Sequence, residues 1–471
     1  MHSPAARRRA NRALSVAIAF TCAMTLAPAT IYAQSALPFE HFRVPVPAAA
    51  GLTDIARGHN GNMWVTDTSG GVSRVTPMGD VARFTSPVLR IAGNSSVIAG
   101  PDGNMWFTAG GIGQITPAGV IAPINFEPKC RPTSFLPNEP DCRRSYPLWA
   151  TVGGDRKVWF VSTQPGRPSI IRVDPQTRTT TEFDPYLPGF EAGEPSQLAN
   201  VVTGRDGNVW FGAQARGYTP DQPIPPVQIG RITPAGAIDY FPIAPVVSNG
   251  RYFSVYDIFR GPDGDPWVLL SSSPLSSSPV GQSSGPGILH TYSVTPTGQL
   301  RPRPAFPLGA QRPITGPDGA IWFGIGRREV ARMTVDGRIT RFPDATTDQV
   351  IADAVAFDRR GDLWVAYSRF VRNFGQGAGG RVARLKLAPK MTLTVRRATN
   401  RRIRIRVERT PALGTLSIAL RGHGVNRRFV TTGARRVINQ QLPKGRYRLS
   451  VAFDGRDGWK DTRLSRSLQL R

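Results

Sequence analysis

Four polar residues of this 471-residue chain could bind a ligand or a metal ion: Asp67, Tyr256, Asp353 and Tyr367. Each lies at a fixed distance from a tryptophan of a repeated segment, either eleven residues before it or three residues after it. If the repeats close into a ring, we expect these residues at the rim of its channel. Asp67 and Asp353 could then approach each other and hold Mg²⁺ or Ca²⁺. The alternative is that they cap strand ends beside solvent.

Two further pairs of residues could form a disulfide or contact a ligand. Cys130 and Cys142 are the cysteines that remain beyond the N-terminal segment, and two cysteines in an exported chain favour one local disulfide. The alternative is two free thiols. Arg216 and Tyr218 lie in a proline-rich stretch and could contact an aromatic or acidic ligand, although an ordinary surface loop fits them equally.

A repeated segment runs from residue 37 to residue 388. Its first part is a tight turn followed by a tryptophan strand, as in GPDGNMWFTA at 100–109. Its second part is a shorter turn, as in GRITPAG at 230–236. The first part occurs in seven copies. Their tryptophans are Trp64, Trp106, Trp159, Trp210, Trp267, Trp322 and Trp364.

Each repeat predicts four short antiparallel strands, because Pro, Asp and Gly favour the tight turn between two apolar runs. Four strands in about 42 residues match one propeller blade. The sequence therefore predicts an all-β chain with a seven-bladed β-propeller over 37–388. A linear β-solenoid and a row of small sandwiches are the rival architectures. The last repeat lacks a fourth strand, and residues 39–45 would supply it and close the ring without an open edge.

The GPDGxxWF and IGRITPxG pairing resembles the virginiamycin B lyase (streptogramin B lyase) family of propellers. This resemblance implies a magnesium-assisted elimination that opens a cyclic depsipeptide at an ester. It also implies a histidine after a proline about ten or eleven residues before a blade tryptophan, with glutamates nearby.

The residues implied by the resemblance are missing at the positions that we compared. Eleven residues before each tryptophan there is no histidine, and the chain contains no Pro-His pair. Three residues after each tryptophan only Asp67 is acidic. We therefore assign no catalytic residue from the sequence.

The order of the strands indicates which face of the propeller should bind a ligand. The short Gly-Pro turns fall on one face, and the long insertions fall on the other, together with the connections between repeats. Long loops on a rigid scaffold are the usual place for binding. We read Ser271–Gly287, which is rich in Ser, Pro and Gly, as a flexible flap. The long insertions are 125–147, 213–228, 271–287 and 369–380.

Residues 1–33 have the pattern of a secretory signal peptide, with Arg7, Arg8 and Arg9 before an apolar run. The alternative is an N-terminal membrane anchor. No other stretch has the roughly 20 apolar residues of a membrane span. We therefore expect an exported protein, secreted or held in the periplasm or cell envelope, with no transmembrane segment in the mature chain.

Residues 390–471 differ in composition from the repeats and hold 21 Lys and Arg against 4 Asp and Glu. Alternation such as RIRIRV at 402–407 and five or more short strands predict a small immunoglobulin-like β-sandwich. Its arginines should attract an anionic surface or polysaccharide, although a solvated basic face is the plain alternative. Nucleic acid is a poor match, because aromatic residues for base stacking are few.

Three functions fit the sequence. The first is a propeller that binds a small-molecule or envelope ligand on the long-loop face without chemistry. The second is a lyase or hydrolase with a rearranged site, for example a Mg-dependent carbon–oxygen lyase acting on a streptogramin B. The third is an architectural envelope protein. The 40% hydrophobic content excludes a disordered polyelectrolyte despite the net charge of +27.

Overall fold

A computed structural model describes most of the chain. All regular secondary-structure elements of the described residues are β-strands. The described residues are 31–32, 39–47, 50–89, 95–126, 147–162, 168–185, 196–215, 226–244, 247–248, 251–274, 288–345, 350–369, 380–387, 390–397, 402–410, 415–432, 435–454 and 462–470. No helix in these ranges is long and apolar enough to cross a membrane. The all-β prediction is therefore confirmed.

The first four sheets of the repeat region are four-stranded, antiparallel and ordered as in the sequence. They comprise β3 (Leu52–Arg57), β4 (Met63–Asp67), β5 (Val72–Val75) and β6 (Val81–Phe84); β7 (Val97–Ala99), β8 (Met105–Thr108), β9 (Ile112–Ile115) and β10 (Ile121–Ile124); β11 (Pro147–Val152), β12 (Val158–Ser162), β13 (Ser169–Val173) and β14 (Thr180–Phe183); and β15 (Ser196–Thr203), β16 (Val209–Ala215), β17 (Val227–Ile232) and β18 (Ile238–Ala244).

The next two sheets keep this pattern and each have one short additional strand at an edge, and the last sheet takes its fourth strand from residues 39–43. They comprise β19 (Val247–Ser248), β20 (Arg251–Arg260), β21 (Pro266–Pro274), β22 (Ile288–Val294) and β23 (Leu300–Arg303); β24 (Ala310–Thr315), β25 (Ile321–Ile325), β26 (Glu329–Met333), β27 (Ile339–Pro343) and β1 (Ile31–Tyr32), which pairs with β27 in parallel; and β28 (Val350–Phe357), β29 (Leu363–Arg369), β30 (Arg381–Leu385) and β2 (Phe39–Arg43).

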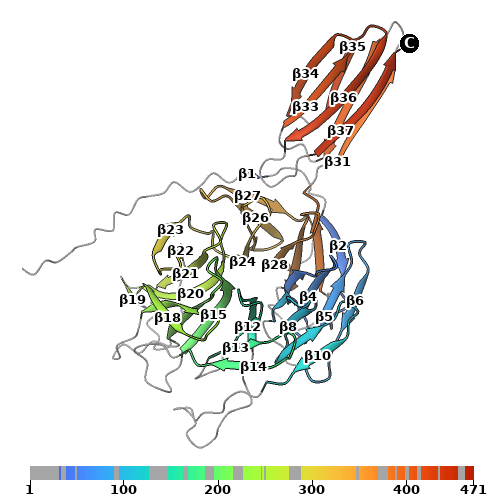
Figure 1. Cartoon of the computed structure of the whole chain (residues 1–471). Helices are drawn as coiled ribbons and strands as arrows, with labels where there is room; N and C mark the ends of the chain where they lie inside the picture. The colour runs from blue at the N-terminus through green and yellow to red at the C-terminus, as the bar shows by residue number, and fades with distance from the viewer. Residues whose placement is uncertain are drawn as a thin grey trace, which may run out of the picture.

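The innermost strands of these sheets contact one another in a closed circle, in the order β3, β7, β11, β15, β20, β24, β28 and again β3. Figure 1 shows the resulting ring, so the fold is a β-propeller. The strand β2 closes it by pairing antiparallel with β30, with Phe39 opposite Leu385 and Arg43 opposite Arg381. This is the closure that the sequence predicted.

The repeat motif is a set of contacts within and between sheets. In the first turn, an aspartate carboxylate accepts a hydrogen bond from the indole Nε1 of the buried tryptophan, as from Trp106 to Asp102 at 3.0 Å. In the sheets of Trp64, Trp159, Trp210 and Trp364, an arginine of the third strand stacks on the tryptophan. Arg172, for example, lies 5.5 Å from the Trp159 ring centroid and donates to the Pro234 carbonyl of the next sheet at 2.5 Å.

The glycine of the second turn is required by packing as well as by backbone shape. Gly119 has φ +100, and a Cβ there would collide with the Phe84 ring of the preceding sheet. Gly79 faces Phe42 of β2 in the same way, so the contact that joins neighbouring sheets also joins the two ends of the ring.

The C-terminal residues form two further sheets. One has the order β31 (Lys390–Arg397), β32 (Arg402–Thr410), β35 (Arg435–Gln441), and the other β34 (Val425–Thr431), β33 (Thr415–Gly422), β36 (Gly445–Asp454), β37 (Thr462–Leu470). Burial alternates along β33, where Leu416, Ile418 and Leu420 are buried. They belong to the same apolar cluster as Ile403 and Ile405 of β32, so the two sheets enclose one core.

Candidate functional site

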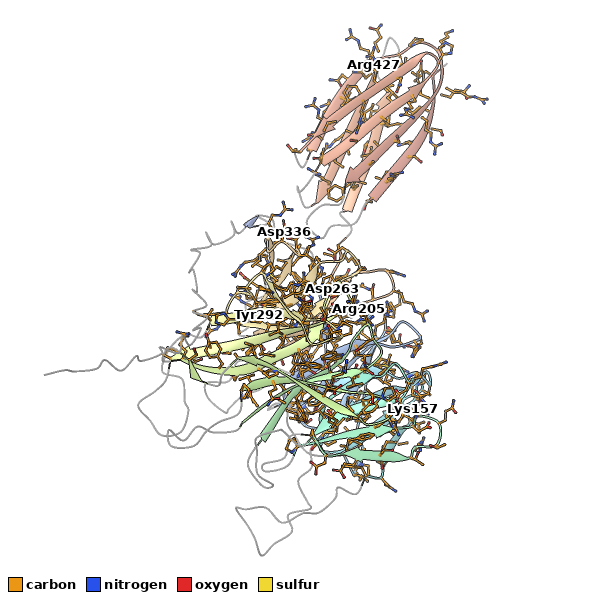
Figure 2. All side chains as sticks on the ribbon, turned by 60° about the vertical axis from the view of Figure 1, so that its left-hand side comes forward. Lys157, Arg205, Asp263, Tyr292, Asp336 and Arg427 are labelled. Atoms are coloured by element: carbon orange, nitrogen blue, oxygen red, sulfur yellow. The ribbon has the colours of Figure 1, made fainter. Side chains whose placement is uncertain are left out.

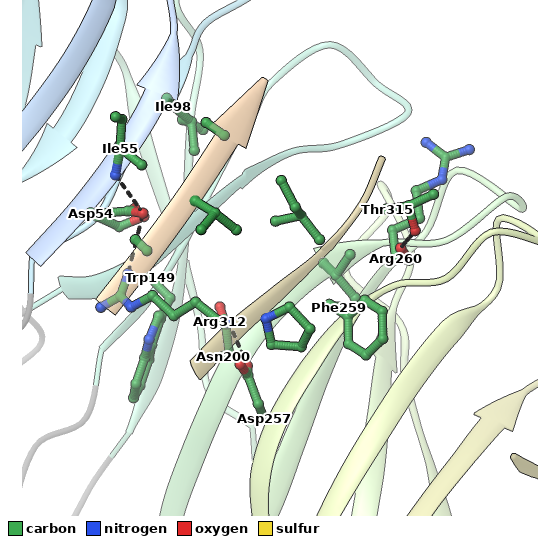
Figure 3. A pocket seen from close by; sticks show the side chains of 18 of the residues that line it. Asp54, Ile55, Ile98, Trp149, Asn200, Asp257, Phe259, Arg260, Arg312 and Thr315 are labelled. Atoms are coloured by element: carbon green, nitrogen blue, oxygen red, sulfur yellow. Dashed lines mark hydrogen bonds and ion pairs between the residues drawn. The ribbon is translucent and has the colours of Figure 1, made fainter. Parts of the chain in front are cut away.

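A channel of about 750 Å³ is lined by residues from all seven innermost strands. Ile55, Ile258 and Val355 contribute apolar surface to it, and polar side chains lie near the starts of several strands. A concave space of this size with a few converging polar groups is the usual form of a small-ligand site. Figure 3 shows that Asp54, Asn200, Asp257 and Arg312 approach one another in this space.

Irregular strand pairing positions the polar residues. Six of the seven innermost strands, all except β7, carry a register shift, as between Val255 and Asp257 in the middle of β20 and between Gln311 and Ile314 in β24. A bulge inserts an extra residue and redirects the neighbouring side chain, and bulges are frequent beside functional sites. Here most of the bulges lie where the connections between sheets enter the innermost strands, at the end that the sequence predicted to bind.

Arg312 has the least usual backbone of the site. Its φ is +39, in the region that non-glycine residues rarely adopt, so the surrounding structure holds it at a cost. Its Nη1 lies 3.4 Å from Oδ1 of Asp54. The other Asp54 oxygen accepts hydrogen bonds from the Ser96 hydroxyl and the Val97 amide, both at 3.0 Å. Asp54 therefore links three innermost strands.

Asp257 forms the second half of the cluster. Its Oδ1 accepts hydrogen bonds from Asn200 Nδ2 at 2.8 Å and from the Ile258 amide at 2.7 Å. Burial raises the pKa of Asp257, and the charge of Asp54 adds to this, whereas these hydrogen bonds and Arg312 oppose the rise. Asp257 is therefore a carboxyl group that protonates more readily than an exposed aspartate.

Tyr256 and Asp353, two of the predicted rim residues, occupy the bulges beside this cluster. Tyr256 is 39% exposed and donates from its hydroxyl to the Ala310 carbonyl at 3.0 Å. Burial and the charge of Asp257 raise the pKa of Tyr256. Asp353 is half-buried, and within the described ranges no group forms a hydrogen bond or ion pair with it. Burial raises the pKa of Asp353 to about 6, against the attraction of Arg312.

Like Tyr256 and Asp353, the other two predicted rim residues are not among the residues that line this channel. Asp67 is the buried last residue of β4, where it accepts from Arg83 Nε at 2.9 Å and from the Gly71 amide at 3.2 Å. Burial would raise the pKa of Asp67, but hydrogen bonds from Arg83 and Ser69 outweigh it and lower the pKa. Tyr367 is also buried and donates to Asp344 Oδ2 at 2.8 Å. Both therefore stabilise the ends of their strands.

The pairing of Asp67 and Asp353 as metal ligands stays a prediction. Among the described residues, no group of three or more His, Cys, Asp or Glu could hold a metal ion. The oxygens of Asp67 are already engaged by Arg83 and the turn. The loop candidates Arg216 and Tyr218, the cysteines Cys130 and Cys142, and residues 1–30 lie outside the described residues.

Reading the sequence at eleven residues before each tryptophan missed the residues that form the cluster. Asp54, Asn200, Asp257 and Arg312 lie ten residues before their tryptophans. Ser96 and Trp149 occupy the same position in their repeats. Comparing the repeats at ten residues before each tryptophan, instead of eleven, would therefore have found the cluster. No histidine occurs at this position either, and no histidine lines the channel.

The unpaired carboxylate of Asp353 predicts a pH-dependent gain in stability when it is removed. We expect Asp353→Asn to raise the free energy of unfolding by about 2 to 3 kcal/mol at pH 8, the cost of a pKa raised from 3.8 to about 6. A raised folded-state pKa contributes stability at low pH that is lost as the pH rises from about 4 to about 6, so the gain should vanish at pH 4.

Urea unfolding of the variant at both pH values measures this effect. The control is Asp336→Asn, because the hydrogen bond from Thr334 lowers the pKa of that exposed aspartate, and its removal should bring no gain at pH 8. An equal gain for Asp353→Asn at pH 4 and pH 8 would contradict the assignment.

Comparisons with known proteins assign this chain to no family. No protein-family model matches the chain, and no curated protein matches it. A gluconolactonase from Xanthomonas campestris is 14% identical, with 75% of this chain and 98% of that chain covered at a TM-score of 0.39. The Cps50 (Swd1) propeller domain of Myceliophteria thermophila is 11% identical, with 74% and 99% covered at 0.47.

A third solved structure aligns with more of the chain. The extracellular domain of a hybrid two-component system from B. thetaiotaomicron is 11% identical and covers 92% of this chain, at a TM-score of 0.44. The alignment spans 58% of that protein's length. At these identities and scores, the similarities carry no argument about ligand or reaction.

Proposed function

We propose that this chain is an exported, seven-bladed β-propeller that binds a small cationic ligand at the bulged end of its channel. The blades would span 37–388 after a signal peptide at 1–33, and an immunoglobulin-like sandwich would span 390–471. The observation that carries the ligand class is an imbalance of charge. Three carboxylates, those of Asp54, Asp257 and Asp353, interact electrostatically with the guanidinium of Arg312. The other arginines of the channel lining, Arg57 and Arg260, lie at the far ends of β3 and β20.

The imbalance favours a ligand with an ammonium group. Asp54 already has Arg312 and two hydrogen-bond donors, and Asp257 has two donors. Asp353 is the carboxylate with no bonded group in the described ranges. A half-buried carboxylate without a counter-ion is costly, and an ammonium group beside it would remove that cost. Asn200, whose carboxamide donates to Asp257, lines the same channel.

Binding of spermidine tests this proposal by titration calorimetry on the purified mature protein. We expect binding at pH 7.5 and about tenfold weaker binding at pH 5, where Asp353 becomes neutral. Asp353→Asn should lose a similar factor at pH 7.5, and Asp336→Asn should keep the original affinity. Equal affinity in both variants, or tighter binding of citrate that depends on Asp353, would reject the proposed ligand class.

The resemblance to virginiamycin B lyases supports the scaffold part of the proposal and gives a second test. With a streptogramin B and Mg²⁺, we expect the substrate to stay intact, because no histidine occupies either position before the blade tryptophans. Elimination would leave the mass unchanged and shift the chromatographic peak, whereas hydrolysis would add one water. Either product would restore the enzyme alternative.

A further inference from the structure

The outward face of the C-terminal four-stranded sheet combines small side chains with arginines. Because Leu416, Ile418 and Leu420 of β33 point into the core, Ser417, Ala419 and Arg421 lie on the opposite face. Strand pairing extends this face across the sheet. Its small residues are Ser417, Ala419, Ser450, Ala452, Ser465 and Ser467, with Ala419 opposite Ser450 and Ser450 opposite Ser465.

Exposed arginines border these small residues. Arg421 of β33 lies directly opposite Arg448 of β36, and Arg446 follows on the same face. Arg428 of β34 lies opposite Ala419, and Arg463 of β37 lies opposite Ala452. We call this surface the arginine-rimmed face, with Arg421, Arg428, Arg446, Arg448 and Arg463 as its rim. In Figure 2, side chains extend outward from both C-terminal sheets.

Few acidic residues lie near the rim arginines to balance their positive charge. Strands β33, β34 and β37 contain no Asp or Glu, and in β36 the one acidic residue is Asp454 at its last position. Arg428 donates to the Ser417 hydroxyl at 3.0 Å, and no carboxylate among the described residues pairs with a rim arginine. Like charges directly opposite each other in a sheet, such as Arg421 and Arg448, are destabilising. A bound polyanion would relieve this repulsion.

The other sheet of the C-terminal region provides a comparison. Its outward face also carries arginines, including Arg402 and Arg404. There, Glu408 forms ion pairs with Arg406 and, at 3.8 Å, with Arg435. This face is therefore partly neutralised and has no floor of serines and alanines, so it serves as a matched control.

We propose that the arginine-rimmed face binds an acidic polysaccharide built from uronic acid residues. Guanidinium groups bind carboxylates through two parallel hydrogen bonds, which suits a rim that meets the acid groups of the sugars. The hydroxyls of Ser450, Ser465 and Ser467 on the floor can donate to and accept from sugar hydroxyls. The small floor lets a flat sugar ring approach the sheet. Charge and hydroxyl complementarity together favour a uronate polymer over a phosphate polymer, which has fewer hydroxyls to bind.

The full mature protein should bind polygalacturonate, measured by biolayer interferometry on the immobilised polymer at 0.15 M salt. The double variant Arg421→Gln/Arg448→Gln should weaken binding at least tenfold, and Arg402→Gln/Arg404→Gln should weaken it less than twofold. Both variants remove two exposed positive charges, so net charge is matched, and circular dichroism with thermal unfolding checks that each one folds.

Three results would overturn the proposal. Equal weakening in the two double variants would mean attraction to overall charge, which salt screens. Tighter binding of polyphosphate, or of phosphatidylglycerol vesicles, than of polygalacturonate would assign the face to phosphate groups. Failure to bind any of these would leave a solvated basic face. The channel proposal is unaffected by each result, because spermidine binding depends on Asp353.

Discussion

Replacing Arg384 with alanine should lower the free energy of unfolding by about 3 kcal/mol, because an ion pair, the stacking on two aromatic rings and a backbone hydrogen bond are lost together. Arg384 is 7% exposed and joins three segments of the ring. Its guanidinium lies 5.2 Å from the Trp364 ring centroid and 5.6 Å from that of Phe42. It bonds Glu40 of β2 and donates to the Pro77 carbonyl of the first sheet at 2.8 Å. Its removal should therefore weaken ring closure.

The matched control is Arg332→Ala, in the corresponding strand position of the preceding sheet. Arg332 donates to Asp318 of its own sheet at 2.7 Å. We expect that variant to lose about 1 kcal/mol, as for a partly exposed ion pair. Urea unfolding followed by tryptophan fluorescence measures both variants. Equal losses would show that Arg384 stabilises its own sheet and contributes nothing special to closure.

Replacing Arg312 with methionine should cost about 3 kcal/mol at pH 8 and about 1 kcal/mol or less at pH 4.5. Methionine keeps the side-chain length but leaves Asp54, Asp257 and Asp353 without their cation. The folded-state pKa values of Asp257 and Asp353, already raised by burial, should rise further above the unfolded values. Stability is then retained at low pH and lost as the pH rises through the raised values.

A double variant separates this electrostatic cause from a packing defect. At pH 8, Asp353→Asn should raise the free energy of unfolding by at least 1 kcal/mol more in the Arg312→Met background than in the unchanged protein, because interacting charges are coupled by about that much. The measurement is urea unfolding at both pH values for the two single variants and the pair. A loss that does not change with pH, or strict additivity, would show that Arg312 acts through packing or backbone shape.

The repeated motifs predicted the fold because each of them forms contacts between residues that are close in the sequence. A Gly-Pro-Asp-Gly turn specifies its own geometry, and Asp102 bonds the Trp106 indole four residues away. Gly119 packs against the Phe84 ring of the preceding sheet so closely that no side chain would fit at this position. The apolar alternation in 402–407 likewise determined which side of β32 is buried. The sequence alone therefore determined the all-β class, the order of the sheets and the strand Phe39–Arg43 that closes the ring.

Only the tertiary structure decided which polar residues face the channel. A bulge changes which side of a strand a residue occupies, and its position depends on pairing with the neighbouring strand. Counting along the chain therefore selected Tyr256 and Asp353, on the bulges, and missed Asp54 and Asp257. Asp67 was indistinguishable from a ligand-binding residue until its contact with Arg83, sixteen residues away, showed that it stabilises the end of its strand. Local rules determine strands and turns, whereas the site depends on contacts between strands that are distant in the sequence.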